Sequence, residues 1–273
     1  MLKRLTPEYI FQCSYTDFVG LVNQTNVPPG SFSTLTEWIT NGFITAESHL
    51  VEVACTTGFS IREISRLTGC SGEGVDLSEV SIDRATTNTR DDFSDGRLRF
   101  VSGDATLFVP KKKATHVIVG AALGFFPKPK MMLDQLTQFF TNDRGYLLAA
   151  PFYVTSSVPH QLIDEARNVL GISPTVAPYK EVMRLYSNFS IRYECRHIPV
   201  QETKEEIHHY CISTISRASK ELNDDRPEIF SAMYDRLFTI RELTNSLRQY
   251  QGYSVLVLGY NKCEFGNRYV ELF

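Results

Sequence analysis

Acidic residues accompany two apolar runs in the first half of the chain, at spacings suited to the recognition of a nucleoside. Asp76 lies near the end of the run 73–77, and Asp104 follows the run 98–103. The first carboxylate could accept hydrogen bonds from both hydroxyls of a ribose, and the second from the amino group of a base. Residues 54–58 precede Asp76 and have small side chains, which let backbone approach a ligand. Together these features predict an adenosine pocket without the full glycine fingerprint of a dinucleotide site.

The elements that must position these residues alternate between short apolar runs and amphipathic segments. Strands are expected at 49–55, 73–77, 98–103, 116–123 and 146–150, with helices between them, one of which begins after Ser78 as N-cap and another of which covers 131–140. This alternation implies crossover connections and a parallel sheet covered on both faces. The predicted fold class is therefore α/β, and ligands are expected outside the carboxyl ends of the strands.

The flanking segments are expected to be mostly helical. Residues 1–48 form a predicted helical arm, which is broken at 27–31. We expect later helices at 159–170, 180–186, 204–222 and 227–247, and strands at 189–200 and 253–260. The predicted organisation is an arm (1–48), a core (49–153), later strands with a helical cap on the substrate side (154–250), and a last strand that completes the same sheet (251–273).

Composition excludes several classes of protein. The 273 residues are 42% hydrophobic and 22% charged, which argues against disorder, and 28 basic against 31 acidic residues give a net charge of −3. That charge provides no global attraction to nucleic acid or to acidic membranes. Six cysteines without a CxxC pair predict buried thiols in a reducing compartment and no metal site. Because a signal peptide and a long apolar run are also missing, we expect a cytoplasmic protein.

Five segments, in this order, resemble the motifs of class I S-adenosylmethionine-dependent methyltransferases: 51–58, 74–78, 103–105, 116–123 and 144–148. The flanking segments resemble, more weakly, small-molecule methyltransferases of bacterial type. The resemblance implies a Rossmann-like, seven-stranded, mostly parallel sheet, with S-adenosylmethionine as cofactor and S-adenosylhomocysteine as its product. One departure is clear, since Ala54 and Thr56 stand where the family usually has glycine and only Gly58 is kept. Their Cβ atoms should move the loop away from the ligand or bend it differently.

The resemblance also implies roles for individual residues. Glu52 would orient the methionine amine, Asp76 would hold the ribose and Asp104 the adenine, with Leu77 and Val80 against the adenine ring. A loop at 29–31 would close over the methionine end. The complete set of implied cofactor-binding residues is Gly30, Ser31, Glu52, Ala54, Cys55, Thr56, Gly58, Asp76, Leu77, Gly103, Asp104, Ala105 and Gly120.

The acceptor side is less specified. The segment after the fourth predicted strand lacks the Asp/Asn-Pro-Pro-Tyr motif of the DNA methyltransferases that act on adenine N6 or cytosine N4. The sequence also shows no paired-glutamate loop of the protein arginine methyltransferase type and no acidic metal cluster of the magnesium-dependent catechol enzymes. A small-molecule acceptor is therefore the default. His208 and His209 are candidates for a general base, the alternative being that they face solvent on an amphipathic helix. Residues expected to contact the acceptor are Tyr15, Phe152, Tyr153 and Tyr210.

The predicted function is methyl transfer to an oxygen, nitrogen or carbon nucleophile by in-line displacement. Two alternatives remain: an RNA or protein methyltransferase with the same core, and a non-catalytic cofactor-binding protein with a degenerate glycine loop. A dehydrogenase is set aside because Ala54, Thr56 and Phe59 occupy the glycine positions of its fingerprint. The long C-terminal helices could supply the interface of a homodimer.

Overall fold

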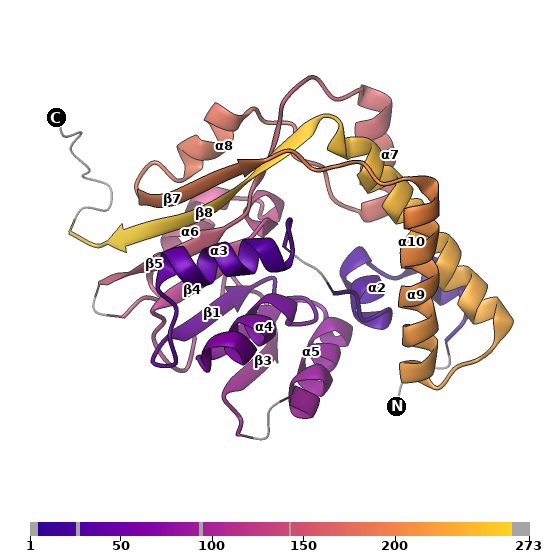
Figure 1. Cartoon of the computed structure of the whole chain (residues 1–273), viewed down its shortest axis with the longest axis horizontal. Helices are drawn as coiled ribbons and strands as arrows, with labels where there is room; N and C mark the ends of the chain where they lie inside the picture. Colours follow the sequence, from indigo (N-terminus) through magenta and orange to yellow (C-terminus); the bar gives the residue numbers. More distant parts are fainter. Residues whose placement is uncertain (1–4, 26–27, 93–94, 142, 264–273) are drawn as a thin grey trace.

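A single twisted sheet forms the centre of the molecule (Figure 1). The computed structural model describes residues 5–25, 28–92, 95–141 and 143–263. The strands of this part pair in the order β3-β2-β1-β4-β5-β8-β6, and β7 also pairs with β8. The first five strands are parallel, whereas β8 runs antiparallel to its neighbours. The strands are β1 His49–Val53, β2 Ser71–Asp76, β3 Leu98–Ser102, β4 His116–Gly120, β5 Arg144–Ala149, β6 Phe152–Val154, β7 Ser190–His197 and β8 Gln251–Asn261.

The short strand β6 occupies the same strand position as β5. Ala149 pairs with Leu256 of β8, and Phe152 pairs with Tyr253, so both strands follow one register along the same partner. The interruption falls at Pro151, which has no N–H to donate, although its carbonyl still accepts from the Ser254 amide at 3.1 Å. The sheet therefore has the seven strand positions that the sequence predicts.

The helices agree closely with the expected segments. Ser78 caps α5, because its Oγ accepts from the Ser81 amide at 3.1 Å, and Gly69 ends α4 in the left-handed conformation. Several expected strands end earlier in the structure, among them β1 at Val53, β4 at Gly120 and β7 at His197. At Gly120 a φ of 51° takes the backbone out of the extended conformation, and a 3-10 helix follows at Ala122–Phe125. The helices are α1 Pro7–Gln12, α2 Tyr15–Leu21, α3 Phe32–Gly42, α4 Phe59–Thr68, α5 Glu79–Asp92, α6 Pro129–Thr137, α7 His160–Leu170, α8 Tyr179–Leu185, α9 Lys204–Leu222 and α10 Pro227–Arg248.

Three apolar clusters hold these elements together. On one sheet face, α3 and α4 bury residues such as Trp38 and Ile61. On the other face, α6 and α8 bury Met132 and Val182. The third cluster lies among α1, α2, α7, α9 and α10, which form a helical cap beside the sheet (Figure 1). The N-terminal segment is thus divided between two partners, since α1 and α2 pack in the cap whereas α3 packs on the sheet. No helix in the described ranges has the length and apolar character needed to cross a bilayer.

Helix α2 lies directly against the start of α5. An ideal Cβ on Gly20 would be 2.6 Å from the Ser81 nitrogen, so only glycine permits this approach. Two hydrogen bonds support the contact: Ser81 Oγ donates to the Thr16 carbonyl at 2.8 Å, and Ser78 Oγ donates to Asp17 at 2.6 Å. The cap is therefore fastened to the segment that follows β2.

We expect Gly20→Ala to lower the free energy of unfolding by about 1–3 kcal/mol, because the added methyl group must displace the backbone of α5. Chemical denaturation measures this change. Gly124→Ala is the matched control, since its ideal Cβ would meet Thr175 Oγ1 at an ordinary 3.7 Å. Equal stabilities of the two variants would contradict the close α2–α5 packing.

Candidate functional site

The loop 54–58 after β1 adopts an unusual backbone conformation. The φ angles of Ala54, Thr56 and Gly58 are 52°, 48° and 72°, so three alternate residues lie in the left-handed region that favours glycine. For the alanine and the threonine this conformation costs about 1–2 kcal/mol each. The loop therefore takes a glycine-like path although two of its three glycine positions carry side chains.

Asp76 at the end of β2 stabilises this strained loop. Its Oδ2 accepts from the Thr56 amide and its Oδ1 from the Ser78 amide, both at 2.9 Å. Burial raises the pKa of Asp76, the backbone amides of Ser78, Thr56 and Leu77 lower it, and the nearby carboxylate of Asp17 raises it again. Each carboxylate oxygen retains a further lone pair. The carboxylate thus couples the loop to α5 and keeps the capacity to accept from a ligand.

Asp17 is a member of the site that the sequence analysis missed. It lies on α2 and accepts from Ser78 Oγ at 2.6 Å, which brings a second carboxylate near Asp76. The two hydrogen-bonded residues are 61 positions apart in the chain. No pattern in the arm signals this contact, because it depends on the packing of α2 against α5.

Glu52 of β1 is buried, with 5% of its surface exposed, on the sheet face that carries α4. Its Oε2 accepts from the Ile61 amide at 3.2 Å, in the first turn of α4. Burial raises the pKa of Glu52 to about 8; hydrogen bonds from Ser60 and Ile61 oppose the shift, and the charge of Asp76 adds to it. Glu52 therefore sets the direction of α4, whose amino end follows the loop.

An apolar surface and a carboxylate lie together beyond β2 and β3. The side chain of Leu77 is 74% exposed, which is unusual for leucine. Asp104 is exposed as well, and its Oδ1 accepts from the amide and hydroxyl of Thr106 at 2.8 and 2.7 Å; these bonds lower its pKa. The Gly103 amide donates to the Asp76 carbonyl at 2.8 Å, and Ala105 is buried beside it. This edge offers a flat apolar contact next to a hydrogen-bond acceptor.

The loop before α3 lies between the ends of β4 and β8. Gly30 and Ser31 have φ angles of 80° and 50°. An ideal Cβ on Gly30 would be 2.7 Å from Tyr253 Oη, and one on Gly120 would be 3.9 Å from the Pro28 Cβ. Residues Gly30 and Gly120, which are distant in sequence, are thus brought to one place at the carboxyl edge of the sheet. Cys55, in the separate loop 54–58 after β1, is buried.

The four aromatic residues expected to contact an acceptor have different positions. Tyr15 and Tyr210 approach each other beside Arg241, whose guanidinium lies 4.4 Å from the Tyr210 ring centroid. Phe152 packs edge-on against Tyr253 at 6.1 Å, on the sheet face that carries α3.

Tyr153 is not brought to this site. Because side chains alternate along a strand, Tyr153 points to the opposite sheet face from Phe152. It is buried there and packs against Tyr179 at 5.3 Å between ring centroids. Its position corresponds to a core residue, which corrects the expected role in acceptor binding.

His208 and His209 lie on the exposed surface of α9. His208 Nδ1 is 2.7 Å from Tyr234 Oη, so its described partner belongs to α10. The helical repeat places their neighbour Ile207 in the cap core and turns both histidines outward. The expectation of a general base here is thus not supported by the geometry, and the solvent-facing alternative describes both residues.

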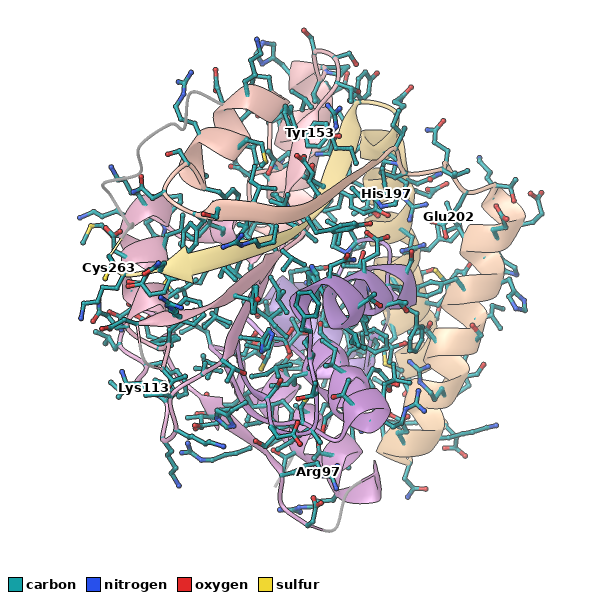
Figure 2. All side chains as sticks on the ribbon, turned by 60° about the vertical axis from the view of Figure 1, so that its left-hand side comes forward. Arg97, Lys113, Tyr153, His197, Glu202 and Cys263 are labelled. Carbon is teal, nitrogen blue, oxygen red and sulfur yellow. The ribbon has the colours of Figure 1, made fainter. Side chains whose placement is uncertain are left out.

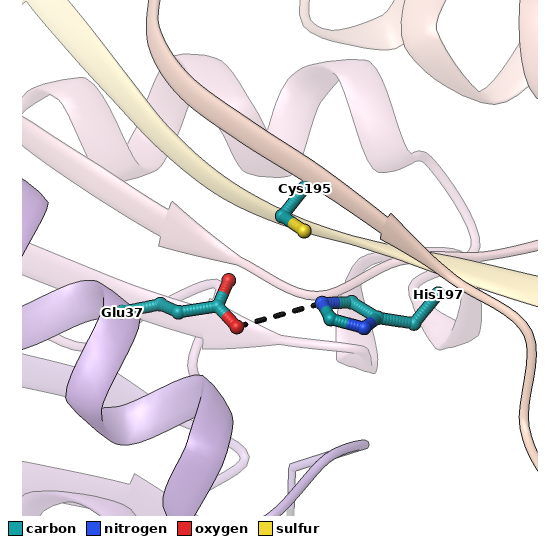
Figure 3. Close-up of side chains that lie close together, drawn as sticks. All are labelled: Glu37, Cys195 and His197. Atoms are coloured by element: carbon teal, nitrogen blue, oxygen red, sulfur yellow. Dashed lines mark ion pairs between the residues drawn. The ribbon is translucent and has the colours of Figure 1, made fainter.

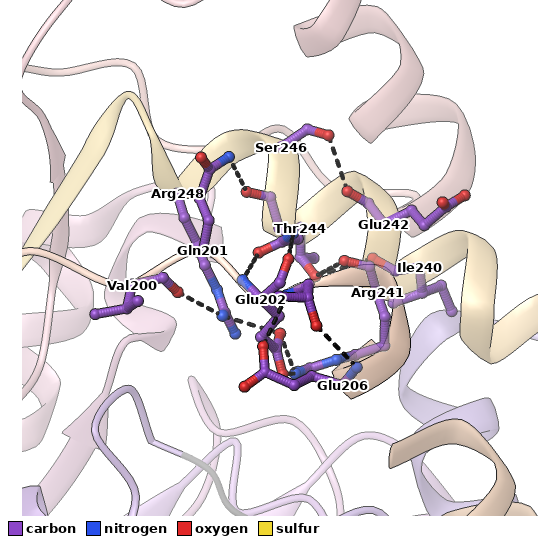
Figure 4. Close-up of polar contacts among 12 residues, drawn as sticks. Val200, Gln201, Glu202, Glu206, Ile240, Arg241, Glu242, Thr244, Ser246 and Arg248 are labelled. Atoms are coloured by element: carbon purple, nitrogen blue, oxygen red, sulfur yellow. Dashed lines mark hydrogen bonds and ion pairs between the residues drawn. The ribbon is translucent and has the colours of Figure 1, made fainter. Parts of the chain in front are cut away.

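A polar cluster fixes the linker 198–203 between β7 and α9. Figure 2 labels His197, which precedes this linker, and Glu202, which lies within it. Glu202 forms an ion pair with Arg248 at 2.9 Å and accepts from Arg241 through both carboxylate oxygens (Figure 4). Asn245 completes the cluster by exchanging two hydrogen bonds with the Glu202 backbone. This cluster holds α10 to the linker and positions Arg241 beside Tyr210.

Comparison with known proteins assigns a family to the centre of the chain. Residues 51–148 match the family described as a methyltransferase domain. An uncharacterized protein of Haemophilus influenzae is 20% identical over 162 residues, which correspond to 58% of this chain and 64% of that protein.

Solved structures share the fold over most of the chain. The MccD protein has a TM-score of 0.69 at 24% identity, covering 86% of this chain and 100% of that one. A methyltransferase from Geobacter sulfurreducens, in complex with S-adenosylhomocysteine, has a TM-score of 0.62 at 18% identity, with coverages of 89% and 96%. For a phosphoethanolamine N-methyltransferase of Haemonchus contortus, in complex with phosphomonomethylethanolamine and S-adenosylhomocysteine, the TM-score is 0.67 at 12% identity, with coverages of 94% and 60%.

The raised pKa of Glu52 predicts a specific pH dependence of stability. Between its ordinary value of 4.5 and about 8, the unfolded chain loses this proton while the folded protein keeps it. Rising pH therefore favours the unfolded state in this window, and Glu52→Gln should remove the effect. We expect the stability of the variant relative to the wild type to increase by about 1–3 kcal/mol from pH 5 to pH 8.

Denaturant unfolding of both proteins at the two pH values provides the measurement. Glu79→Gln, at the exposed first turn of α5, is the matched control. Parallel pH profiles of Glu52→Gln and the wild type would show that Glu52 ionises equally in both states.

Proposed function

Residues 51–148 of the chain are a methyltransferase domain of class I, and on this premise we propose that the protein transfers the methyl group of S-adenosylmethionine to a nucleophile of a small molecule. The observation that supports this most directly is the left-handed loop 54–58, whose central amide is bound by Asp76. That contact sets loop backbone and a carboxylate with free lone pairs side by side at the carboxyl edge of the sheet.

The residues at this edge fit the parts of the cofactor. Asp76 would accept from the ribose hydroxyls, and Leu77 would cover the adenine ring with its exposed side chain. Asp104 would accept from the adenine amino group. The loop carrying Gly30 and Ser31 would close over the methionine end, beside Gly120. Thr56 Oγ1 is buried and has no hydrogen-bond partner in the part of the chain that the structure describes, which leaves one donor available to a ligand in the same loop.

Methyl transfer requires the protein mainly to position the cofactor and the acceptor relative to each other. When bound, S-adenosylmethionine supplies an electrophilic methyl group on a sulfonium, and its leaving thioether needs no proton. The chain must therefore hold the acceptor in line with that methyl group and exclude water. Packing of α2 against α5, together with the loop at Gly30, provides cover from the side of the arm. A base is required only for an acceptor that arrives protonated.

A small acceptor is favoured by the net charge of the chain and by the residues of the cap. The cap helices stand close to the carboxyl edge of the sheet, and Tyr15, Tyr210 and Arg241 meet on the inner side of the cap. The net charge of −3 gives no general attraction to a nucleic acid. The phosphoethanolamine enzyme with the same fold was solved with a small phosphorylated amine.

Titration calorimetry with S-adenosylhomocysteine tests the cofactor half of the proposal. Asp76→Ala should weaken binding by about 10- to 100-fold through the loss of ribose hydrogen bonds, and Asp104→Ala by about 10-fold through the loss of the adenine contact. Asp104 is exposed, so its variant reports binding without a large effect on folding. Asp83→Ala, on the exposed face of α5, is the control that should bind as the wild type does.

If folded wild-type protein shows no heat of binding at millimolar S-adenosylhomocysteine, the methyl-transfer proposal fails. If the ligand binds but Asp76→Ala and Asp104→Ala bind equally well, the cofactor lies elsewhere. Circular dichroism of each variant separates a loss of binding from a loss of folding.

A further inference from the structure

Three potential metal ligands from different parts of the chain converge on the sheet face that carries α3. Glu37 of α3 and Cys195 and His197 of β7 place one ligand atom each within 4.8 Å of the others. Figure 3 shows the carboxylate and the imidazole facing each other, with the Cys195 sulfur turned to the same space. The positions of Cys195 and His197 explain this, because alternate residues of a strand project from one face.

The groups in this cluster have unused bonding capacity. Glu37 Oε1 and His197 Nε2 are 3.5 Å apart, too far for a good hydrogen bond. Glu37 Oε2 and His197 Nε2 are buried and have no hydrogen-bond partner among the described residues. The side chains of Glu37 and His197 are only 17% and 30% exposed, so hydrogen bonds to solvent water replace the missing partners poorly. The cluster thus contains unsatisfied polar atoms that an ion would satisfy.

The neighbours of the cluster hold its members in place. Tyr253 stacks on the His197 ring at 5.0 Å between centroids, with 18° between the planes. Tyr193, two residues before Cys195 on the same face, interacts with both Glu37 and Cys195. Its phenol hydroxyl can donate to a ligand oxygen or sulfur, as outer-shell residues of metal sites do.

The types of donor indicate the ion. Thiolate, imidazole and carboxylate are the three ligand types of protein zinc sites, whereas magnesium and calcium prefer oxygen alone. In a tetrahedral zinc site neighbouring ligand atoms lie about 3.3–3.8 Å apart, which agrees with the 3.5 Å between Glu37 and His197. A thiolate and a carboxylate would neutralise the charge of Zn²⁺. Three protein ligands would leave one tetrahedral position open, as in catalytic zinc sites.

We propose that Glu37, Cys195 and His197 form a binding site for a single zinc-like divalent cation. The site lies next to the loop of Gly30, because Tyr253 contacts both that glycine and the His197 ring. A bound ion would therefore link α3 to β7 close to the carboxyl edge of the sheet. This site is additional to the cofactor residues and does not depend on methyl transfer.

Calorimetric titration of chelator-treated full-length protein with zinc chloride, in the absence of any cofactor, tests the proposal. We expect one tight equivalent in the wild type. Cys195→Ser and His197→Gln should each weaken it by more than about 100-fold, beyond the loss typical of outer-shell substitutions. Glu37→Gln should weaken it as well, with little change in side-chain volume. Affinity should fall at acid pH, because protons compete for the thiolate and the imidazole.

Cobalt substitution identifies the ligands independently. A thiolate-to-cobalt charge-transfer band should appear in the wild type and disappear in Cys195→Ser. Cys263→Ser and His160→Gln are matched controls, since both residues are exposed and lie outside the cluster. Thermal unfolding monitored by circular dichroism should show that zinc raises the midpoint of the wild type but not of Cys195→Ser.

A tight equivalent that survives in both Cys195→Ser and His197→Gln would overturn the proposal, as would the absence of tight binding by folded wild-type protein. Neither result bears on the cofactor titration, which uses different residues and a different ligand.

Discussion

The carboxylate of Asp76 accepts hydrogen bonds from two backbone amides, that of Thr56 in the loop 54–58 and that of Ser78 before α5. The first bond stabilises a loop that carries alanine and threonine in a conformation suited to glycine. The second orders the start of α5, where Ser78 in turn donates to Asp17 of the arm. Loop, helix and arm therefore depend on one buried acidic side chain. Burial raises the pKa of this carboxyl group and the amide hydrogen bonds lower it, so the contacts that shape the loop also favour the charged form of Asp76.

The antiparallel strand β8 determines how the helical cap meets the sheet. On one edge it pairs with β5 and β6 in a single register, interrupted at Pro151, and on the other edge it pairs with β7. From β7 the chain enters the linker that Glu202 attaches to α10 through Arg241 and Arg248. The sheet and the cap are consequently joined by short, hydrogen-bonded segments. This arrangement brings His197, at the end of β7, beside Tyr253 at the start of β8, and so to the carboxyl edge of the parallel strands.

Most secondary structure could be predicted from the sequence, because it rests on local patterns. The helix Lys204–Leu222 follows from its apolar spacing and from Thr203, whose side chain and that of Glu206 form a capping box. The cofactor edge was also predictable, since small residues and acids stand at the ends of successive strands. Acceptor contacts were harder to predict. Phe152 and Tyr153 are neighbours of similar type, and only their strand pairing places Phe152 beside Tyr253 and Tyr153 in the opposite core.

The sequence by itself determined an α/β sheet with a nucleoside-binding edge, because strand alternation, caps and short motifs are encoded within a few tens of residues. The tertiary structure alone decided which distant side chains meet. Asp17 joins Ser78 through the packing of α2 on α5, and Glu37 meets Cys195 and His197 because α3 covers the face of β7. It also shows that His208 and His209, the candidates for a general base, face away from the cap core on the exposed surface of α9. Contacts between separate elements depend on packing and strand register, which no local pattern specifies.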